Sequence, residues 1–394
     1  MEIAGHGERS DLIERSWNDL PEDIQVEILA LLPMESVYTF RCVNKESNAL
    51  LSNKFISDIW AKRPANREPW LLLCNSFFAT SCMAYCFYTK TWKSCFSICK
   101  GLTGYRYFHR GSAAGLLLLQ KLHTGVNNPL RPSPSGHCPL YVYNPFSRTH
   151  IELPRMRFIK NINTSKLIVE SGSENSYNVV AVGHRVLPEG EGRESAVEIY
   201  ESCTKSWRIE RQLPNELRVM NESVFLDGTF YCLTMEYNRP GMWILGFNIN
   251  APAGTPVVFA SLPELVCNSW VPNLIICGSR ILIVASTATL QEDVMRTVTI
   301  WEFERDDSRG SCLWKEISKM PFIVPFIWFE CVGVGETRVC FHPEEGNQRT
   351  DLVVAYNLGN ESWSQLPRCP TSREAGSDQS WLMAFEARPN MRVT

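Results

Sequence analysis

Residues 17–60 read WNDLPEDIQVEILALLPMESVYTFRCVNKESNALLSNKFISDIW, a stretch that predicts a small helical module. The first helix opens at Pro21, because the first helical turn needs no N–H from that residue. Glu22 and Asp23 follow where the helix dipole favours negative charge. Pro33 ends this helix, because proline cannot continue the backbone hydrogen bonds.

Apolar residues in this stretch recur at intervals of three and four, the spacing of one helix face. The three stripes are Ile24, Ile28 and Leu31; then Val37, Phe40 and Val43 with Leu50 and Leu51; and finally Phe55, Ile56, Ile59 and Trp60. A module of about 40 residues buries little surface by itself. We therefore expect some of its apolar side chains to serve as a docking face for a second protein.

Leu-Pro pairs and apolar positions between residues 20 and 43 also carry a family resemblance. The run consists of Leu20, Pro21, Ile24, Ile28, Leu29, Leu32, Pro33, Phe40, Arg41, Cys42 and Val43. It resembles an F-box, the module that docks a Skp-type adaptor. The resemblance implies these adaptor contacts or their direct support: Leu20, Pro21, Ile24, Ile28, Leu32, Pro33 and Phe40.

The chain departs from the F-box pattern just after Val43. Many F-boxes continue with Cys-Lys-x-Trp, whereas this chain has Asn44, Lys45, Glu46 and Ser47. A buried aromatic side chain contributes roughly 1.5–3 kcal/mol. We therefore expect weaker adaptor binding than in chains that keep the tryptophan.

Composition sets the class of the whole chain. Its 394 residues suggest two or three domains, and 44% hydrophobic content is ample for a large core. The net charge of −3 gives no strong field for nucleic acid or membranes, so neither is an expected partner. The first residues lack the apolar core of a signal peptide, and no long apolar run follows. We expect a soluble intracellular protein of the nucleus, the cytoplasm or both, whose 15 cysteines are reduced.

From about residue 70 the chain repeats one pattern: an apolar strand, a polar turn and a short stretch that closes in Leu-Pro or Met-Pro. The five clearest copies are LYVYNPFSRTHIELP (140–154), VEIYESCTKSWRIERQLP (197–214), LGFNINAPAGTPVVFASLP (245–263), VTIWEFERDDSRGSCLWKEISKMP (298–321) and LVVAYNLGNESWSQLP (352–367). MAYCFYTKTWKSCFSI (83–98) is a sixth, weaker copy. Hairpins such as that at Asp227-Gly228 lie between the copies, which gives about four strands per unit.

Units of 40 to 60 residues with four short strands predict an all-β propeller. Six blades are favoured, and seven stay open. Trp207, Trp314 and Trp363 recur before the closing proline, and we expect them to fill the wedge between blades. The first apolar run, 70–74, and the last, 380–389, are expected to share one blade and close the ring.

The strings GSAAGLLLL and LYVYNPFSRTHIELP and the closing strand resemble the kelch-like domain of plant F-box/kelch-repeat proteins. Single glycines, such as Gly228 and Gly278, stand where kelch blades usually carry a pair. The fold class is thus an N-terminal three-helix F-box followed by a kelch-like propeller. We expect a disordered N-terminus (1–15), an F-box (16–62), a linker (63–69) and a propeller (70–394).

No catalytic motif emerges, so we expect no enzyme activity, catalytic residues, metal or cofactor. Cys82, Cys86, Cys95 and Cys99 with His109 lack the tight spacing of zinc knuckles, and His137 beside Cys138 lies in a proline-rich loop. The basic stretch RMRFIKNINTSK (155–166) reads as a solvated loop, with binding of an acidic partner as the alternative.

The combined reading is an adaptor with two ends. The F-box resemblance implies that the first end binds a Skp-type adaptor and, through it, a cullin ligase. The propeller would then bind an unknown protein substrate for ubiquitination and degradation. Two alternatives remain open: a scaffold whose helical cap packs in cis, and a propeller enzyme.

Overall fold

The computed structural model divides the chain into two compact units, residues 1–64 and 65–394. The structure describes residues 17–31, 40, 43–51, 69–75, 82–87, 89–94, 106–122, 139–145, 149–169, 176–187, 192–236, 239–251, 258–267, 272–288, 296–306, 311–321, 328–345, 348–349, 352–370, 380–386 and 393.

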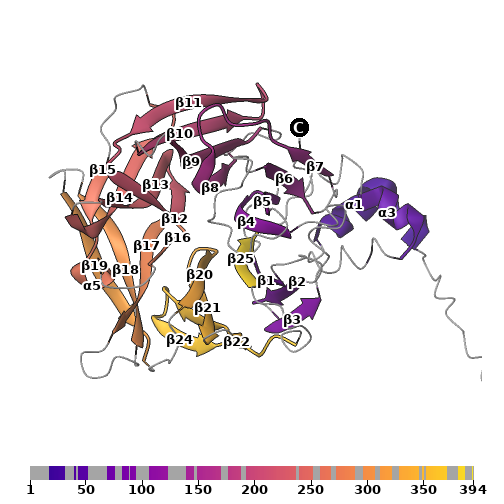
Figure 1. The fold of residues 1–394 in the computed structure, drawn as a ribbon. Helices are drawn as coiled ribbons and strands as arrows, with labels where there is room; N and C mark the ends of the chain where they lie inside the picture. Colours follow the sequence, from indigo (N-terminus) through magenta and orange to yellow (C-terminus); the bar gives the residue numbers. More distant parts are fainter. Residues whose placement is uncertain are drawn as a thin grey trace, which may run out of the picture. The chain divides into compact units, whose positions relative to one another are not determined.

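Helices make up the described part of the first unit (Figure 1). They are η1 (Trp17–Asp19), α1 (Glu22–Leu31) and α3 (Lys45–Leu51). The start of α1 lies where the sequence predicts it, because the carbonyl of Pro21 accepts the N–H of Gln25. The Gln25 amide also donates to the carbonyls of Trp17 and Leu20, which ties η1 to α1.

Asn44 explains part of the departure from the F-box pattern. Its Oδ1 accepts the backbone N–H of Ser47 at 2.6 Å, so Asn44 caps the N-terminus of α3. At this point the chain therefore has an N-capped helix start and lacks the tryptophan that many F-boxes carry. The third predicted stripe, at residues 55–60, lies outside the described residues.

Six antiparallel sheets build the second unit, which confirms six blades rather than seven (Figure 1). Blade 1 has the order β25-β1-β2-β3, with β25 (Ser380–Phe385), β1 (Trp70–Asn75), β2 (Cys82–Cys86) and β3 (Thr91–Ser94). Blade 2 holds β4 (Arg106–Ala113), β5 (Leu116–Leu122), β6 (Leu140–Asn144) and β7 (Thr149–Glu152). Blade 3 holds β8 (Asn161–Ile168), β9 (Asn178–Val186), β10 (Arg193–Glu201) and β11 (Ser206–Leu213).

The remaining three blades follow the same order along the chain. Blade 4 holds β12 (Leu217–Leu226), β13 (Thr229–Glu236), β14 (Arg239–Asn248) and β15 (Val258–Ser261), followed by the short α5 (Glu264–Cys267). Blade 5 holds β16 (Asn273–Cys277), β17 (Arg280–Ala288), β18 (Arg296–Asp306) and β19 (Ser311–Lys319). Blade 6 holds β20 (Trp328–Val334), β21 (Arg338–Glu345), β23 (Val354–Asn357) and β24 (Ser362–Gln365), with β22 (Gln348–Arg349) beside β21.

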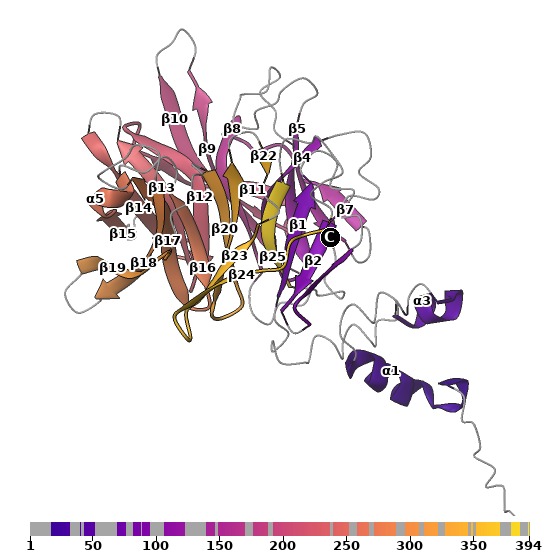
Figure 2. The same cartoon turned by 90° about the horizontal axis from the view of Figure 1, so that it is seen from below.

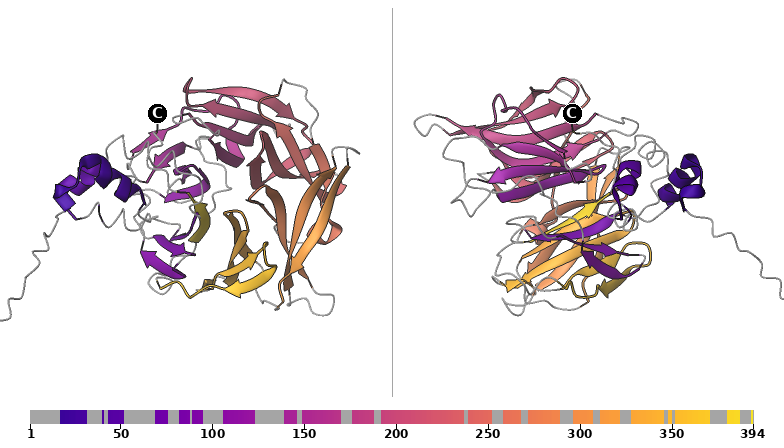
Figure 3. Two further views of the ribbon diagram at one scale, coloured as in Figure 1. Left: turned by 180° about the vertical axis from the view of Figure 1, so that it is seen from behind. Right: turned by 90° about the vertical axis from the view of Figure 1, so that its right-hand side faces the viewer.

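The ring closes by the predicted pairing of the first and last strands. β25 runs antiparallel to β1, with Trp70 opposite Phe385 and Asn75 opposite Ser380. The innermost strands of the six blades are β25, β4, β8, β12, β16 and β20, and each contacts the next around the ring (Figures 2 and 3). Middle strands are covered on both faces, so the run Leu116–Leu119 is fully buried.

The closing Leu-Pro or Met-Pro of each repeat ends the outermost strand. The residue before the proline is buried, and in four blades its N–H donates to a carbonyl on the third strand or directly before it: Leu153 to Leu140, Leu262 to Met242, Met320 to Val298 and Leu366 to Val353. Proline then ends the pairing because it has no N–H to donate.

The recurring tryptophans join neighbouring blades as predicted. Each lies on an outermost strand opposite an aromatic residue and donates its indole N–H to the preceding blade. The bonds run from Trp207 to the Pro154 carbonyl, Trp314 to the Ser261 carbonyl, Trp363 to Ser318 Oγ and Trp92 to the Pro367 carbonyl, at 2.6–3.0 Å. The ring thus gains a polar link wherever this aromatic recurs.

Two details differ from the sequence-based expectations. Cys74 and Cys82 are bonded as a disulfide, because they lie directly opposite on β1 and β2 with their Cα atoms 4.4 Å apart. The expectation of reduced cysteines is therefore wrong for this pair. The basic stretch 155–166 is likewise not one solvated loop, since its second half forms β8.

The first half of that stretch is fixed by a buried carboxylate. Glu198 on β10 is fully buried and accepts the backbone N–H groups of Arg157, Phe158 and Ile159 at 2.6–2.8 Å. Satisfying three donors with one side chain holds the connection between blades 2 and 3 in a single conformation.

Candidate functional site

Five of the seven predicted adaptor-binding residues lie among the described residues, all in or beside η1 and α1. Pro21 and Ile24 are exposed, whereas Leu20, Ile28 and Phe40 are half-buried. Phe40 packs edge-to-face on Trp17, with ring centroids 5.5 Å apart, so it supports the module from within. Leu32 and Pro33 lie outside the described residues.

Part of the apolar surface of this module is uncovered. Ile24 is 40% exposed and Val43 is 64% exposed, while Leu29 on the same helix as Ile24 is fully buried. One face of α1 therefore faces the core of the module, and the adjacent face leaves apolar surface in water. A partner protein that covered this surface would be stabilised by the free energy of burying it, as expected for an apolar docking face.

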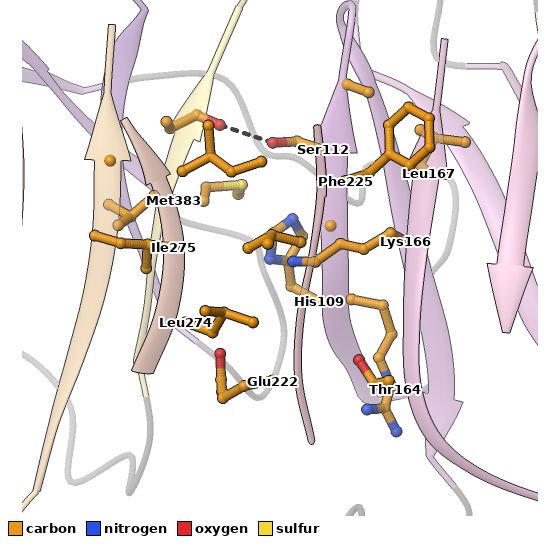
Figure 4. A pocket seen from close by; sticks show the side chains of 18 of the residues that line it. His109, Ser112, Thr164, Lys166, Leu167, Glu222, Phe225, Leu274, Ile275 and Met383 are labelled. Atoms are coloured by element: carbon orange, nitrogen blue, oxygen red, sulfur yellow. Dashed lines mark hydrogen bonds between the residues drawn. The ribbon is translucent and has the colours of Figure 1, made fainter. Parts of the chain in front are cut away.

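A second candidate site lies at the centre of the propeller, where the six innermost strands meet. The cavity there has a volume of about 490 Å³ and is lined from every blade (Figure 4). We call it the central cavity. Its titratable lining includes His109 and Arg110 on β4, Lys166 on β8, Glu222 on β12 and Glu330 on β20.

Basic groups gather on the side of the central cavity formed by β4 and β8. Figure 4 shows the Lys166 side chain pointing at the imidazole of His109. Burial, together with the Lys166 charge, lowers the pKa of His109 to about 3, so the imidazole is neutral at pH 7. Burial also lowers the pKa of Lys166, and the Glu222 carboxylate opposes that shift.

Arg110 is held rigidly on the same side. Its Nε and Nη2 donate to Oε1 of Gln120 at 2.8 and 2.5 Å, and its Nη1 donates to the Asn163 carbonyl at 3.1 Å. These acceptors are neutral, and together they fix the direction of the guanidinium.

Carboxyl groups lie on β12 and β20, the two strands that flank β16. Burial raises the pKa of Glu222, while Lys166 and a hydrogen bond from the Leu274 backbone partly offset the shift. Glu330 accepts the N–H of Leu382 at 2.5 Å, which links blade 6 to the closing strand. The central cavity is therefore basic on one side and acidic on another.

The sequence does not single out this set. It suggests His109 only as a weak zinc-ligand candidate, places Lys166 in a basic stretch, and indicates no role for Glu222. In the part of the chain that the structure describes, no group of three or more potential ligands gathers as a metal site. The helices described there include none long and apolar enough to cross a membrane.

Family comparisons agree with both units. Residues 105–325 match the family model described as the KIB1-4 beta-propeller, and residues 17–56 match that of the F-box domain. The chain belongs to the KIB1-4 beta-propeller family. This member carries an F-box in front of the propeller, and the predicted fold class is confirmed.

Several relatives match this chain over nearly its whole length. F-box only protein 6 of Arabidopsis thaliana is 22% identical over 408 residues, which span 100% of this chain and 77% of the relative. An F-box/kelch-repeat protein of the same plant is 24% identical over 400 residues, which span 92% of this chain and 84% of that relative. The resemblance to plant F-box/kelch-repeat proteins is thereby confirmed.

Matches among solved structures are more distant. The SapL1 lectin, solved with alpha methyl fucoside, aligns with a TM-score of 0.45 and 11% identity, covering 78% of this chain and 94% of the lectin. Such a likeness is too remote to bear on function.

Proposed function

We propose that this chain is the substrate-recognition subunit of an SCF-type ubiquitin ligase. The F-box, placed at 16–62, binds a Skp-type adaptor and through it a cullin, and a linker at 63–69 leads to the propeller at 70–394. The propeller binds a protein target in the nucleus or the cytoplasm. The exposed Ile24 and Val43 on a module that matches an F-box are the observation that supports this proposal most.

In this role the chain itself makes and breaks no bond. It raises the effective concentration of the target near the transferred ubiquitin, and tethering of this kind reaches the millimolar range.

Co-purification with a Skp-type adaptor tests the proposal. Ile24→Arg places a charge on the exposed face of α1, and we expect at least about tenfold less adaptor to be retained because the charge must be desolvated in the interface. Val186→Arg is the matched control, because Val186 is 58% exposed on β9 of the propeller. That control should retain the adaptor fully.

Both variants should melt like the wild type, since each changes an exposed side chain. A wild-type chain that retains no adaptor would refute the proposal and favour a helical cap that packs in cis. An Ile24→Arg protein that still holds the adaptor at wild-type level would show that Ile24 lies outside the contact.

A further inference from the structure

The central cavity is lined entirely by propeller residues, and it carries charges that a simple structural core avoids. Buried ionisable groups are costly unless they are paired or used. Arg110 is almost fully buried, and Lys166 and Glu222 keep partial exposure by facing the cavity. At about 490 Å³ the space is large enough for a small organic molecule.

The charged side chains form a basic group and an acidic group. Lys166 and Arg110 lie on the adjacent strands β8 and β4, and Glu222 lies on β12, the next strand around the ring. Lys166 and Glu222 influence each other electrostatically, but among the described residues neither forms an ion pair within 4.0 Å. A cation and a carboxylate are thus presented separately to the same cavity (Figure 4).

Apolar side chains line the cavity wall beside these charged groups. Leu274 and Ile276 on β16, the strand between β12 and β20, and Met383 on the closing strand β25 line the cavity. A ligand with an aliphatic or aromatic group would bury that group here, with a gain proportional to its apolar area.

We propose that the central cavity binds a small zwitterion of the amino-acid type. Its carboxylate lies at Lys166 beside Arg110, its ammonium group lies at Glu222, and its apolar side chain lies against β16 and β25. The neutral imidazole of His109 accepts or donates one further hydrogen bond. This inference does not rest on the ligase function, because no residue of the F-box takes part.

Fluorine NMR with three matched probes tests the proposal on the full chain. 4-Fluoro-L-phenylalanine carries both charges, 3-(4-fluorophenyl)propionate lacks the amine, and 4-fluorophenethylamine lacks the carboxylate. We expect the amino acid to bind at least about tenfold more tightly than either single-charge probe, because each charge-assisted contact adds about a factor of ten. If none of the probes binds the wild-type protein, or if all three bind it equally, the proposal is overturned. This outcome needs no variant.

Variants locate the site. Lys166→Met should weaken the amino acid and the propionate by about tenfold or more, and Glu222→Gln should weaken the amino acid and the amine. Lys315→Met, on the exposed outer strand β19, is the control and should leave all three affinities within about twofold. Unchanged binding in both cavity variants would place the probe elsewhere and refute the site.

Discussion

At the scale of single residues, burial makes His109 a source of acid sensitivity. Its pKa falls from 6.5 to about 3 on folding, because of burial and the nearby Lys166 charge. The unfolded chain therefore takes up a proton below pH 6.5, whereas the folded protein does not until about pH 3. Stability that is present above pH 6.5 is lost as the pH falls.

His109→Gln should remove the contribution of this imidazole to the pH dependence of the unfolding free energy. Between pH 7 and pH 5 we expect the wild type to lose about 2 kcal/mol more unfolding free energy than the variant, measured by urea titration. His150→Gln, on the exposed outer strand β7, is the control and should follow the wild type. Lys166, Arg110 and Glu222 face the same space and are present in both proteins, so equal losses in wild type and His109→Gln would contradict the assignment.

At the scale of elements, the contact between the inner strands β16 and β20 depends on a missing side chain. A Cβ atom on Gly333 would lie 1.8 Å from the Ile276 carbonyl oxygen, so the two backbones touch directly. Gly333→Ala must push blades 5 and 6 apart, and we expect a loss of about 3 kcal/mol in unfolding free energy. Gly111→Ala on the inner strand β4 is the matched control, because its Cβ would meet Lys166 Cδ at an ordinary 3.5 Å.

The control should change the unfolding free energy by less than about 1 kcal/mol. Both values come from denaturant titration under identical conditions. A Gly333→Ala protein as stable as the Gly111→Ala protein would show that the inner strands can separate without loss.

The outer strands were predictable from the sequence, and the cavity was not. Within a repeat, the closing Leu-Pro or Met-Pro lies only a few residues after Trp207, Trp314 or Trp363. This pattern is local in the sequence, because one turn links the third and fourth strands of a blade. His109, Lys166 and Glu222 instead lie in different repeats and meet through the closure of the ring. A period in the sequence reveals the repeating unit, but it does not say which side chain of each inner strand faces the axis.

At the scale of the whole molecule, one strand closes the propeller. β25 is the last described strand of the chain, and it forms the inner edge of blade 1 by pairing with β1. Without it, β1 and the flank of blade 6 would face water, and each blade depends on its neighbours for burial. A chain that ends at residue 379 should therefore lose its cooperative melting transition or become insoluble.

Restoring the strand at another point of the chain separates closure from mere length. Because Trp70 and Phe385 are direct partners, residues 380–385 followed by an Asn-Gly turn can be inserted before Trp70 of the shortened chain as an ordinary hairpin. We expect this rearranged protein to melt cooperatively within a few degrees of the wild type in calorimetry. If the shortened chain melts like the wild type without the insertion, the ring does not need β25, and the six blades are stable as an open arc.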